Sequence, residues 1–268
     1  GVVLLFFTFS TTQEYYSMPA YPAFALLLGC AMTTQDAWIR RGMKALMAVI
    51  ALALAAIAVI LWNVWALPTP GDISSALTQH PELYTLSLGH IGDLTLQSFS
   101  YLRVPLMLAA IATLVGTAGI FIYRNEKRRA FFAAALMMLI FFHAARLAMI
   151  TFNPYLGSKV LADALMKAPP GKLIEADAYY AFSSVFFYTE RPALLWNGRV
   201  DNLEYGAYAP AAPHVFIDND DFQKLWRGPE RYYLLARNED LPRIEKLAGR
   251  ASVHVVINSG GKSLLSNQ

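Results

Sequence analysis

Charged side chains are scarce in this sequence. Asp, Glu, Lys and Arg make up 15% of its 268 residues, whereas hydrophobic residues make up 56%. A typical soluble domain has about 25% charged residues, so the composition excludes a chain that is soluble throughout. The formal net charge is only +3, and the basic residues of the apolar half fall in two short clusters. We therefore expect no nucleic-acid partner.

Cysteine and the common catalytic motifs are almost absent as well. The single cysteine, Cys30, excludes a disulfide within the chain, and its apolar neighbours indicate a buried, inert thiol. No Ser-His-Asp order, G-x-S-x-G turn or P-loop is present. The sequence therefore gives no evidence of a cofactor, and it leaves dependence on a divalent metal open.

The amino terminus lacks an initiator Met, a charged segment and a cleavage site, so residues 1–9 are not a signal peptide. These residues are apolar, but a membrane span needs about 20 such residues. We expect them to be the end of a helix, and we expect the chain to be the C-terminal fragment of a longer membrane protein.

Long apolar runs fill residues 1–152, and almost none follows. They predict a transmembrane region of about five spans, the first truncated, at residues 1–9, 19–34, 45–66, 104–123 and 130–152. Residues 153–268 alternate short strand and helix patterns, which predicts a soluble α/β domain with a largely parallel sheet. The predicted fold is a multi-span α-helical membrane bundle followed by a small soluble α/β domain.

Two basic clusters indicate the orientation. Residues 40–44 contain three positive charges and residues 124–129 contain four. Basic loops stay in the cytoplasm, so both clusters predict the cytoplasmic side. Residues 13–16, the loop at 67–98 and the domain at 153–268 are then expected on the opposite, periplasmic face of a bacterial inner membrane.

The loop at 67–98 carries spaced apolar residues, which predict one or two amphipathic helices at the membrane interface. It also contains His80 and His90. No other ligand stands at a spacing typical of a metal site, so solvated histidines are the preferred interpretation. Trp62 and Trp65 end the preceding run as interfacial anchors.

Ionisable side chains also occur inside the last apolar run. His143 and Arg146 are three residues apart and so share one helix face. Arg146 either extends to the outer interface or, with His143, binds the phosphate of a lipid. Arg103, at the start of the preceding run, is expected to be an interfacial anchor.

The predicted α/β domain contains two features, carboxylates at strand ends and a Gly-Gly turn, that could have either a structural or a functional role. Its strands are expected at 172–176, 193–196, 214–218, 231–236 and 251–257, and its helices at 158–167, 179–188, 220–226 and 240–248. Carboxylates lie at the expected strand ends, where Asp218 or Asp220 suits a helix cap. Ser259-Gly-Gly-Lys262 resembles half of a phosphate loop without its spacing, and a plain turn is preferred.

A polar, aromatic and proline-rich segment, residues 10–22, separates the first two apolar runs. Its pattern is Phe9-Ser10, then Glu14-Tyr15-Tyr16, then Pro19-Ala-Tyr-Pro-Ala23. This pattern, with the later spans and the terminal α/β domain, resembles the C-terminal part of bacterial C-type glycosyltransferases related to aminoarabinose transferase and protein O-mannosyltransferases. The layout matches over the whole chain, and the motif matches at residues 9–23.

The resemblance implies an enzyme that moves a sugar from a polyprenyl-phosphate donor to a lipid, glycan or protein acceptor at the periplasmic face. It places Tyr16 near the donor phosphate. Some family members carry a Lys where this chain has Thr11, Thr12 and Gln13, so arginines such as Arg146 would neutralise the phosphate. The family's catalytic aspartates lie N-terminal to this motif, so the chain contains no catalytic residue by this comparison and is expected to be inactive alone.

The residues of the segment have other interpretations. Tyr15 and Tyr16 could contact the donor or belong to an interfacial aromatic belt, and Gln13 could donate a hydrogen bond. Glu14 could orient a sugar hydroxyl or cap the helix that begins near Pro19. A non-catalytic, membrane-anchored periplasmic binding or assembly module is the main alternative to an enzyme, and a transporter segment is least favoured.

Overall fold

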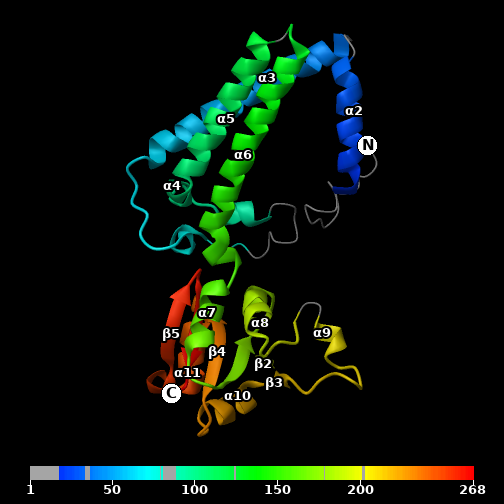
Figure 1. Cartoon of the computed structure of the whole chain (residues 1–268). Helices are drawn as coiled ribbons and strands as arrows, with labels where there is room; N and C mark the ends of the chain where they lie inside the picture. The colour runs from blue at the N-terminus through cyan, green and yellow to red at the C-terminus, as the bar shows by residue number, and fades with distance from the viewer. Residues whose placement is uncertain are drawn as a thin grey trace. The chain divides into compact units, whose positions relative to one another are not determined.

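The computed structural model describes residues 18–33, 37–78, 80, 89–123, 125–177, 179–200 and 203–268. The chain divides into two compact units. The helical unit comprises the described residues of Gly1–Thr69 and Ala76–Met149, and the α/β unit comprises Pro70–Ser75 and the described residues of Ile150–Gln268. Figure 1 shows the elements of each unit along the chain. Residues 70–75 thus join the α/β unit although the sequence placed them in a loop of the membrane half.

The described residues of the chain contain three helices that are long and apolar enough to cross a membrane. These are α3 (Ala37–Val64), α5 (Arg103–Ile122) and α6 (Lys127–Leu156), and they correspond to the third, fourth and fifth predicted runs. The second run forms α2 (Tyr21–Thr33), whose 13 residues reach only about 20 Å, less than the hydrocarbon thickness. The first run lies outside the described residues.

Small residues bring α5 and α6 together. A Cβ atom built on Gly116 would lie 2.4 Å from Met137, and one built on Gly119 would lie 2.6 Å from the Ala133 Cβ. Any side chain at either glycine would push the helices apart. Membrane helices use such small residues because apolar surface alone gives them little reason to associate in lipid.

One expectation for this unit is wrong. Cys30 is exposed on α2, because an apolar neighbourhood in sequence does not distinguish a lipid-facing surface from a protein core. The described part of the 67–98 loop is partly helical, and its helices are short. It contains the short helices η2 (Ile73–Ala76), η4 (Gly89–Asp93) and α4 (Ser98–Tyr101), with a β-bridge between Leu77 and Leu94.

The α/β unit has a six-stranded sheet in the order β3-β2-β1-β4-β6-β5. The first four strands are parallel, and β6 runs antiparallel to both β4 and β5. The strands are β1 (Lys172–Ala176), β2 (Ala193–Trp196), β3 (Phe216–Ile217), β4 (Tyr232–Arg237), β5 (His254–Ser259) and β6 (Lys262–Ser266). The largely parallel sheet is confirmed, but β6 was not predicted.

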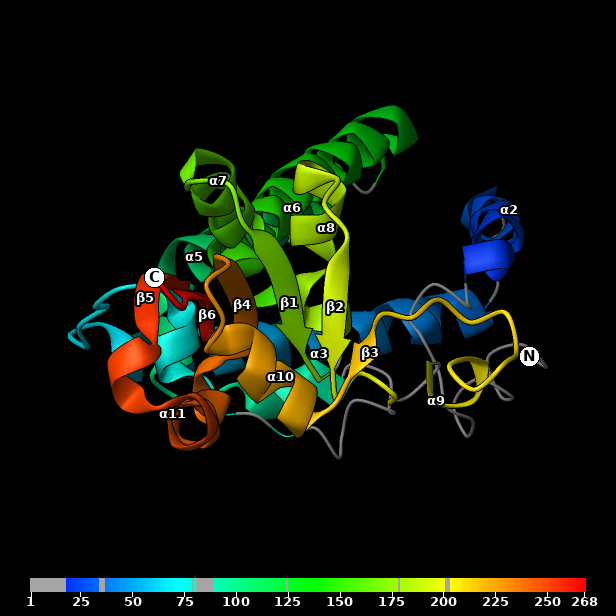
Figure 2. The same cartoon turned by 90° about the horizontal axis from the view of Figure 1, so that it is seen from below.

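Helices cover both faces of this sheet (Figure 2). Helices α7 (Lys159–Lys167) and α8 (Ser183–Thr189) pack on one face with the short 3-10 helix η5 (Tyr179–Phe182). Helices α10 (Asn219–Trp226) and α11 (Leu241–Ala248) pack on the other, and α9 (Leu203–Gly206) lies in the β2–β3 connection. Because both faces are covered, β1 and β4 are buried almost continuously.

The last membrane helix extends beyond residue 152, where the predicted span ends, and a proline does not stop it. Helix α6 continues through Pro154 to Leu156. The amide of Gly157 donates to the Asn153 carbonyl at 2.8 Å, so the final turn keeps helical hydrogen bonding after the proline. A proline in the last turn removes one donor and still allows the following residues to remain helical.

Candidate functional site

His143 and Arg146 lie on one exposed face of α6, whereas Ala144 between them is buried. This confirms that the two side chains share a helix face. Neither residue has a hydrogen-bond or ion-pair partner within the part of the chain that the structure describes. A guanidinium on an apolar helix needs either water or an anion close by, because burying an uncompensated charge in hydrocarbon is costly.

Four other predicted binding residues belong to the polar segment. Gln13, Glu14, Tyr15 and Tyr16 lie outside the described residues. Their contact with a donor stays a prediction that rests on the sequence resemblance.

Arg103 has a structural role within the helical unit. Its Nε and Nη2 donate to the Val64 carbonyl at 3.0 and 2.8 Å, and Nη2 also donates to the Leu67 carbonyl. The guanidinium therefore caps the end of α3, where helical carbonyls have no partner of their own. These bonds occupy two of the guanidinium nitrogens, so Arg146 is the better candidate for anion binding.

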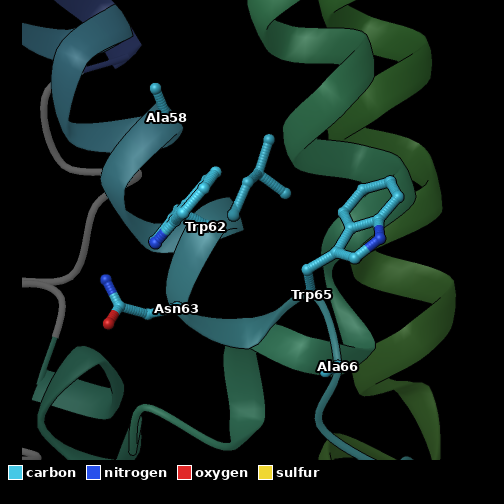
Figure 3. A pocket seen from close by; sticks show the side chains of 6 residues that line it. Ala58, Trp62, Asn63, Trp65 and Ala66 are labelled. Carbon is cyan, nitrogen blue, oxygen red and sulfur yellow. The ribbon is translucent and has the colours of Figure 1, made fainter.

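A groove of about 570 Å³ lies along the last turns of α3, with Trp62, Asn63 and Trp65 in its lining. Figure 3 shows the two indoles and the Asn63 amide projecting from this end of the helix. Both tryptophans are largely exposed, as expected of interfacial anchors. None of the described residues that line it is charged, so the groove suits a hydrocarbon chain better than a phosphate group.

Asp93 contacts both loop histidines, His80 and His90. His90 Nδ1 lies 3.2 Å from Asp93 Oδ2, and the His80 amide donates to Asp93 Oδ1 at 2.8 Å. Asp93 is buried, and it therefore organises the loop by accepting these bonds. Among the described residues, no group of three or more His, Cys, Asp or Glu side chains is placed to hold a metal ion.

The Ser259–Lys262 turn is the connection of the β5–β6 hairpin. Gly260 and Gly261 have φ values of +64° and +74°, the left-handed conformation that a two-residue hairpin turn requires. The amide of Gly260 donates to Asp72 Oδ2 at 2.8 Å. A Cβ on Gly260 would lie 1.6 Å from the Pro154 carbonyl oxygen. The turn therefore packs against protein backbone and leaves no room for a phosphate at this position.

Asp72 joins residues 70–75 to this hairpin. It also accepts hydrogen bonds from the Ser74 amide, at 3.0 Å, and from the Ser74 hydroxyl. Burial raises the pKa of Asp72, but the hydrogen bonds from Ser74 and from the Gly260 amide outweigh burial and hold the pKa below its usual value. The ionised carboxylate is thus the form that stabilises this junction.

Lys262 follows the turn and is buried. Its Nζ donates to the carbonyls of Tyr155 and Gly157 at 2.7 and 3.0 Å, so it caps the end of α6 in the way Arg103 caps α3. Burial, with the positive charge of Arg237 nearby, lowers the pKa of Lys262 to about 8.

The carboxylates near the strand ends have different roles. Asp218 accepts from the amides of Asp220 and Asp221, both at 2.9 Å, which confirms the predicted cap of α10. Glu175 is 0% exposed within β1, and neither of its carboxylate oxygens has a partner among the described residues. Burial and the charge of Asp177, partly offset by Arg237, raise the pKa of Glu175 to about 9. Glu175 is therefore a neutral acid at pH 7.

The apolar helices and the three-layered α/β unit together define a membrane protein with a small α/β domain. No protein-family model and no curated protein sequence matches the chain. Two solved structures of ArnT from Cupriavidus metallidurans do match it, one bound to undecaprenyl phosphate and one in the apo state. Their TM-scores are 0.69 and 0.64, each with 19% sequence identity.

These similarities cover 100% of this chain and 44% of the ArnT chain. The chain therefore spans less than half the length of the structures it resembles. The shared fold confirms, at the level of architecture, the resemblance to the aminoarabinose transferase group and the predicted fold class.

Proposed function

We propose that this chain is part of an integral membrane glycosyltransferase of the bacterial inner membrane. The enzyme moves a hexose or pentose from a polyprenyl-phosphate donor to a lipid, glycan or protein acceptor at the periplasmic face. The observation that carries this proposal is the fold, because the whole chain superposes on an ArnT structure that contains undecaprenyl phosphate. Fold alone does not define a reaction, so the site must supply a reason to bind such a donor.

Arg146 supplies that reason. It lies ten residues before Leu156, the last residue of α6, and so about 15 Å along the helix from its end. At this depth its side chain reaches the outer boundary of the hydrocarbon layer, where the phosphate of a polyprenyl lipid would lie. A guanidinium binds phosphate oxygens in a bidentate manner, and His143 adds a second donor one turn away.

The polar segment completes the proposed donor site. Tyr16 would contact the phosphate, and Gln13, Glu14 and Tyr15 would contact the phosphate or the sugar. We assign no catalytic role to any residue of this chain. We place the general base, which activates the acceptor, in the part of the full-length protein that this chain does not span, and we expect the chain alone to be inactive.

The test is the affinity of the full-length protein in detergent micelles for undecaprenyl phosphate. Arg146→Gln should weaken binding roughly 10- to 100-fold, because it removes a charge-assisted hydrogen bond of about 1.5–3 kcal/mol. Arg128→Gln is the matched control, since Arg128 is an exposed arginine at the opposite end of the same helix. Equal affinity of both variants and the unaltered protein would exclude Arg146 from the donor site. No binding by the unaltered protein would favour the alternative, a membrane-anchored module without catalysis.

A further inference from the structure

The α/β unit exposes several large aromatic side chains on η5 and α8. This segment buries Phe182 and Val185 in the core below it. Three other aromatic side chains of the segment are exposed: Tyr180 by 43%, Phe187 by 75% and Tyr188 by 44%. We refer to these three exposed residues as the aromatic surface.

The aromatic surface is unusual for a domain in water. Phe187 and Tyr188 pack edge to face with ring centroids 5.1 Å apart, and the Tyr180 ring lies tilted against the Tyr179 ring, with centroids 4.8 Å apart. A water-facing helix normally carries polar residues on its outer side. An apolar surface that a fold keeps exposed generally marks an interaction site.

The η5–α8 segment, which carries the aromatic surface, lies next to the end of α6, and this position indicates what the surface binds. Ser158, two residues after α6, donates its hydroxyl to the Ala181 carbonyl at 2.6 Å. A Cβ on Gly157 would lie 3.7 Å from the Ser184 hydroxyl. Lys159, which follows Ser158, has its Nζ 5.1 Å from the centre of the Tyr188 ring. The η5–α8 segment therefore packs directly beside the residues that follow the membrane helix.

The length of α6 determines the depth of these residues. The helix has 30 residues, which is about 45 Å. This length equals the thickness of a bilayer including both headgroup layers, about 40–45 Å. When the basic residues at the start of α6 lie at one surface, residues 156–159 lie at the headgroup layer of the other.

We propose that the aromatic surface binds the lipid headgroup layer on the side of the membrane where α6 ends. Tyrosine and other aromatic side chains favour this layer because their rings are apolar and their polar groups stay hydrated. Exposed Leu156 and Val160 extend the apolar area towards the helix end. Lys159 is paired with Asp163 at 2.7 Å, so aromatic burial and not net charge provides the attraction. The contact positions the α/β unit on the bilayer and is independent of the proposed enzymatic function.

The test is site-directed spin labelling of the full chain in vesicles of phosphatidylethanolamine and phosphatidylglycerol. Cys30→Ser removes the native thiol, and single cysteines are then introduced as Phe187→Cys and Tyr180→Cys. Val59→Cys, on the membrane helix α3, is the lipid reference. Lys224→Cys, on α10 at the opposite face of the sheet, is the water reference, because its side chain is 77% exposed. Each nitroxide is measured for relaxation by oxygen, which concentrates in lipid, and by a water-soluble nickel complex.

We expect the ratio of oxygen to nickel accessibility at both aromatic positions to lie between those of Lys224→Cys and Val59→Cys, clearly above the water reference. The ratio should not change with salt concentration. A ratio equal to the water reference would overturn the proposal. Low accessibility to both reagents, with an immobilised spectrum, would also overturn it, because protein and not lipid would then cover the surface. Both positions are exposed, so the substitutions remove no core packing.

Discussion

Glu175 gives the most specific physical prediction, because a buried carboxyl without a partner connects protonation directly to stability. Its pKa is about 9 in the folded α/β unit, well above the usual value for a glutamate. Between these two values the folded state holds a proton that the unfolded state has released. The free energy of unfolding therefore falls as pH rises, by about 1.4 kcal/mol per pH unit for one such group.

The useful pH window is 5 to 7. As the pH rises from 5 to 7, the contribution of Glu175 to the free energy of unfolding should fall by roughly 3 kcal/mol. Lys262 adds little slope there, because its pKa of about 8 keeps it protonated in both states. Asp72, with a lowered pKa, is ionised in both states above pH 5. The Glu175→Gln variant keeps the shape and the neutral charge, so it should lose this pH dependence and be the more stable protein at pH 7.

Hydrogen exchange of the β1 and β4 amides, read by mass spectrometry and corrected for intrinsic rates, measures the stability of the sheet directly. The control is Glu204→Gln, since Glu204 is exposed on α9 and should leave the slope unchanged. Equal slopes for the unaltered protein and Glu175→Gln would refute the assignment of a buried neutral acid.

Three further substitutions test the packing. Gly260→Ala should destabilise the α/β unit by more than about 2 kcal/mol, because a side chain there adds a clash with the Pro154 carbonyl to the strain of a left-handed backbone. Gly261→Ala is the control, since it has the same strain without the clash. Similar losses of thermal stability in both variants would contradict the close contact between Gly260 and Pro154. Gly116→Ala should lower the melting temperature in detergent by separating α5 and α6. Gly29→Ala is the control, because an added Cβ there meets open space and should leave the melting temperature unchanged. Equal melting temperatures of the two variants would rule out the close contact of Gly116 with α6. Asp218→Ala should lower the free energy of unfolding, measured with urea, by about 1 kcal/mol, because α10 loses its cap. Asp218→Asn should keep the cap and the stability. An equal loss of stability with Asn would indicate that Asp218 has a role other than capping.

Elements of this fold were predictable from the sequence where they carry a local pattern of apolar residues. The spans α3, α5 and α6 were predictable, because a bilayer requires long apolar helices whatever the rest of the fold does. Strands β1, β2 and β4 were predictable because parallel strands covered on both faces need continuous apolar residues. The β6 strand was missed because Lys262, Ser263 and Ser266 make it polar, although all three are buried. The Gly-Gly turn before it was the available signal.

The candidate site was only partly predictable. Helical periodicity was sufficient to place His143 and Arg146 on one face. It gave no information on whether another element covers that face, and the exposure of both residues required the packed structure. Arg103 and Arg146 are both arginines near the same predicted interface, yet of the two only Arg103 bonds to backbone carbonyls among the residues that the structure describes. Sequence cannot separate the two, because those carbonyls belong to residues about 40 positions away.

The sequence by itself determined that this is a membrane protein with a terminal α/β domain. Membrane spans and parallel strands are local patterns, imposed by the solvent around each segment. Only the tertiary structure decided the roles of Glu175, Lys262, Asp72 and the Ser259–Lys262 turn. Each depends on partners, or on the absence of partners, far along the chain, and burial changes the energy of a charged or polar group more than any neighbour in sequence does.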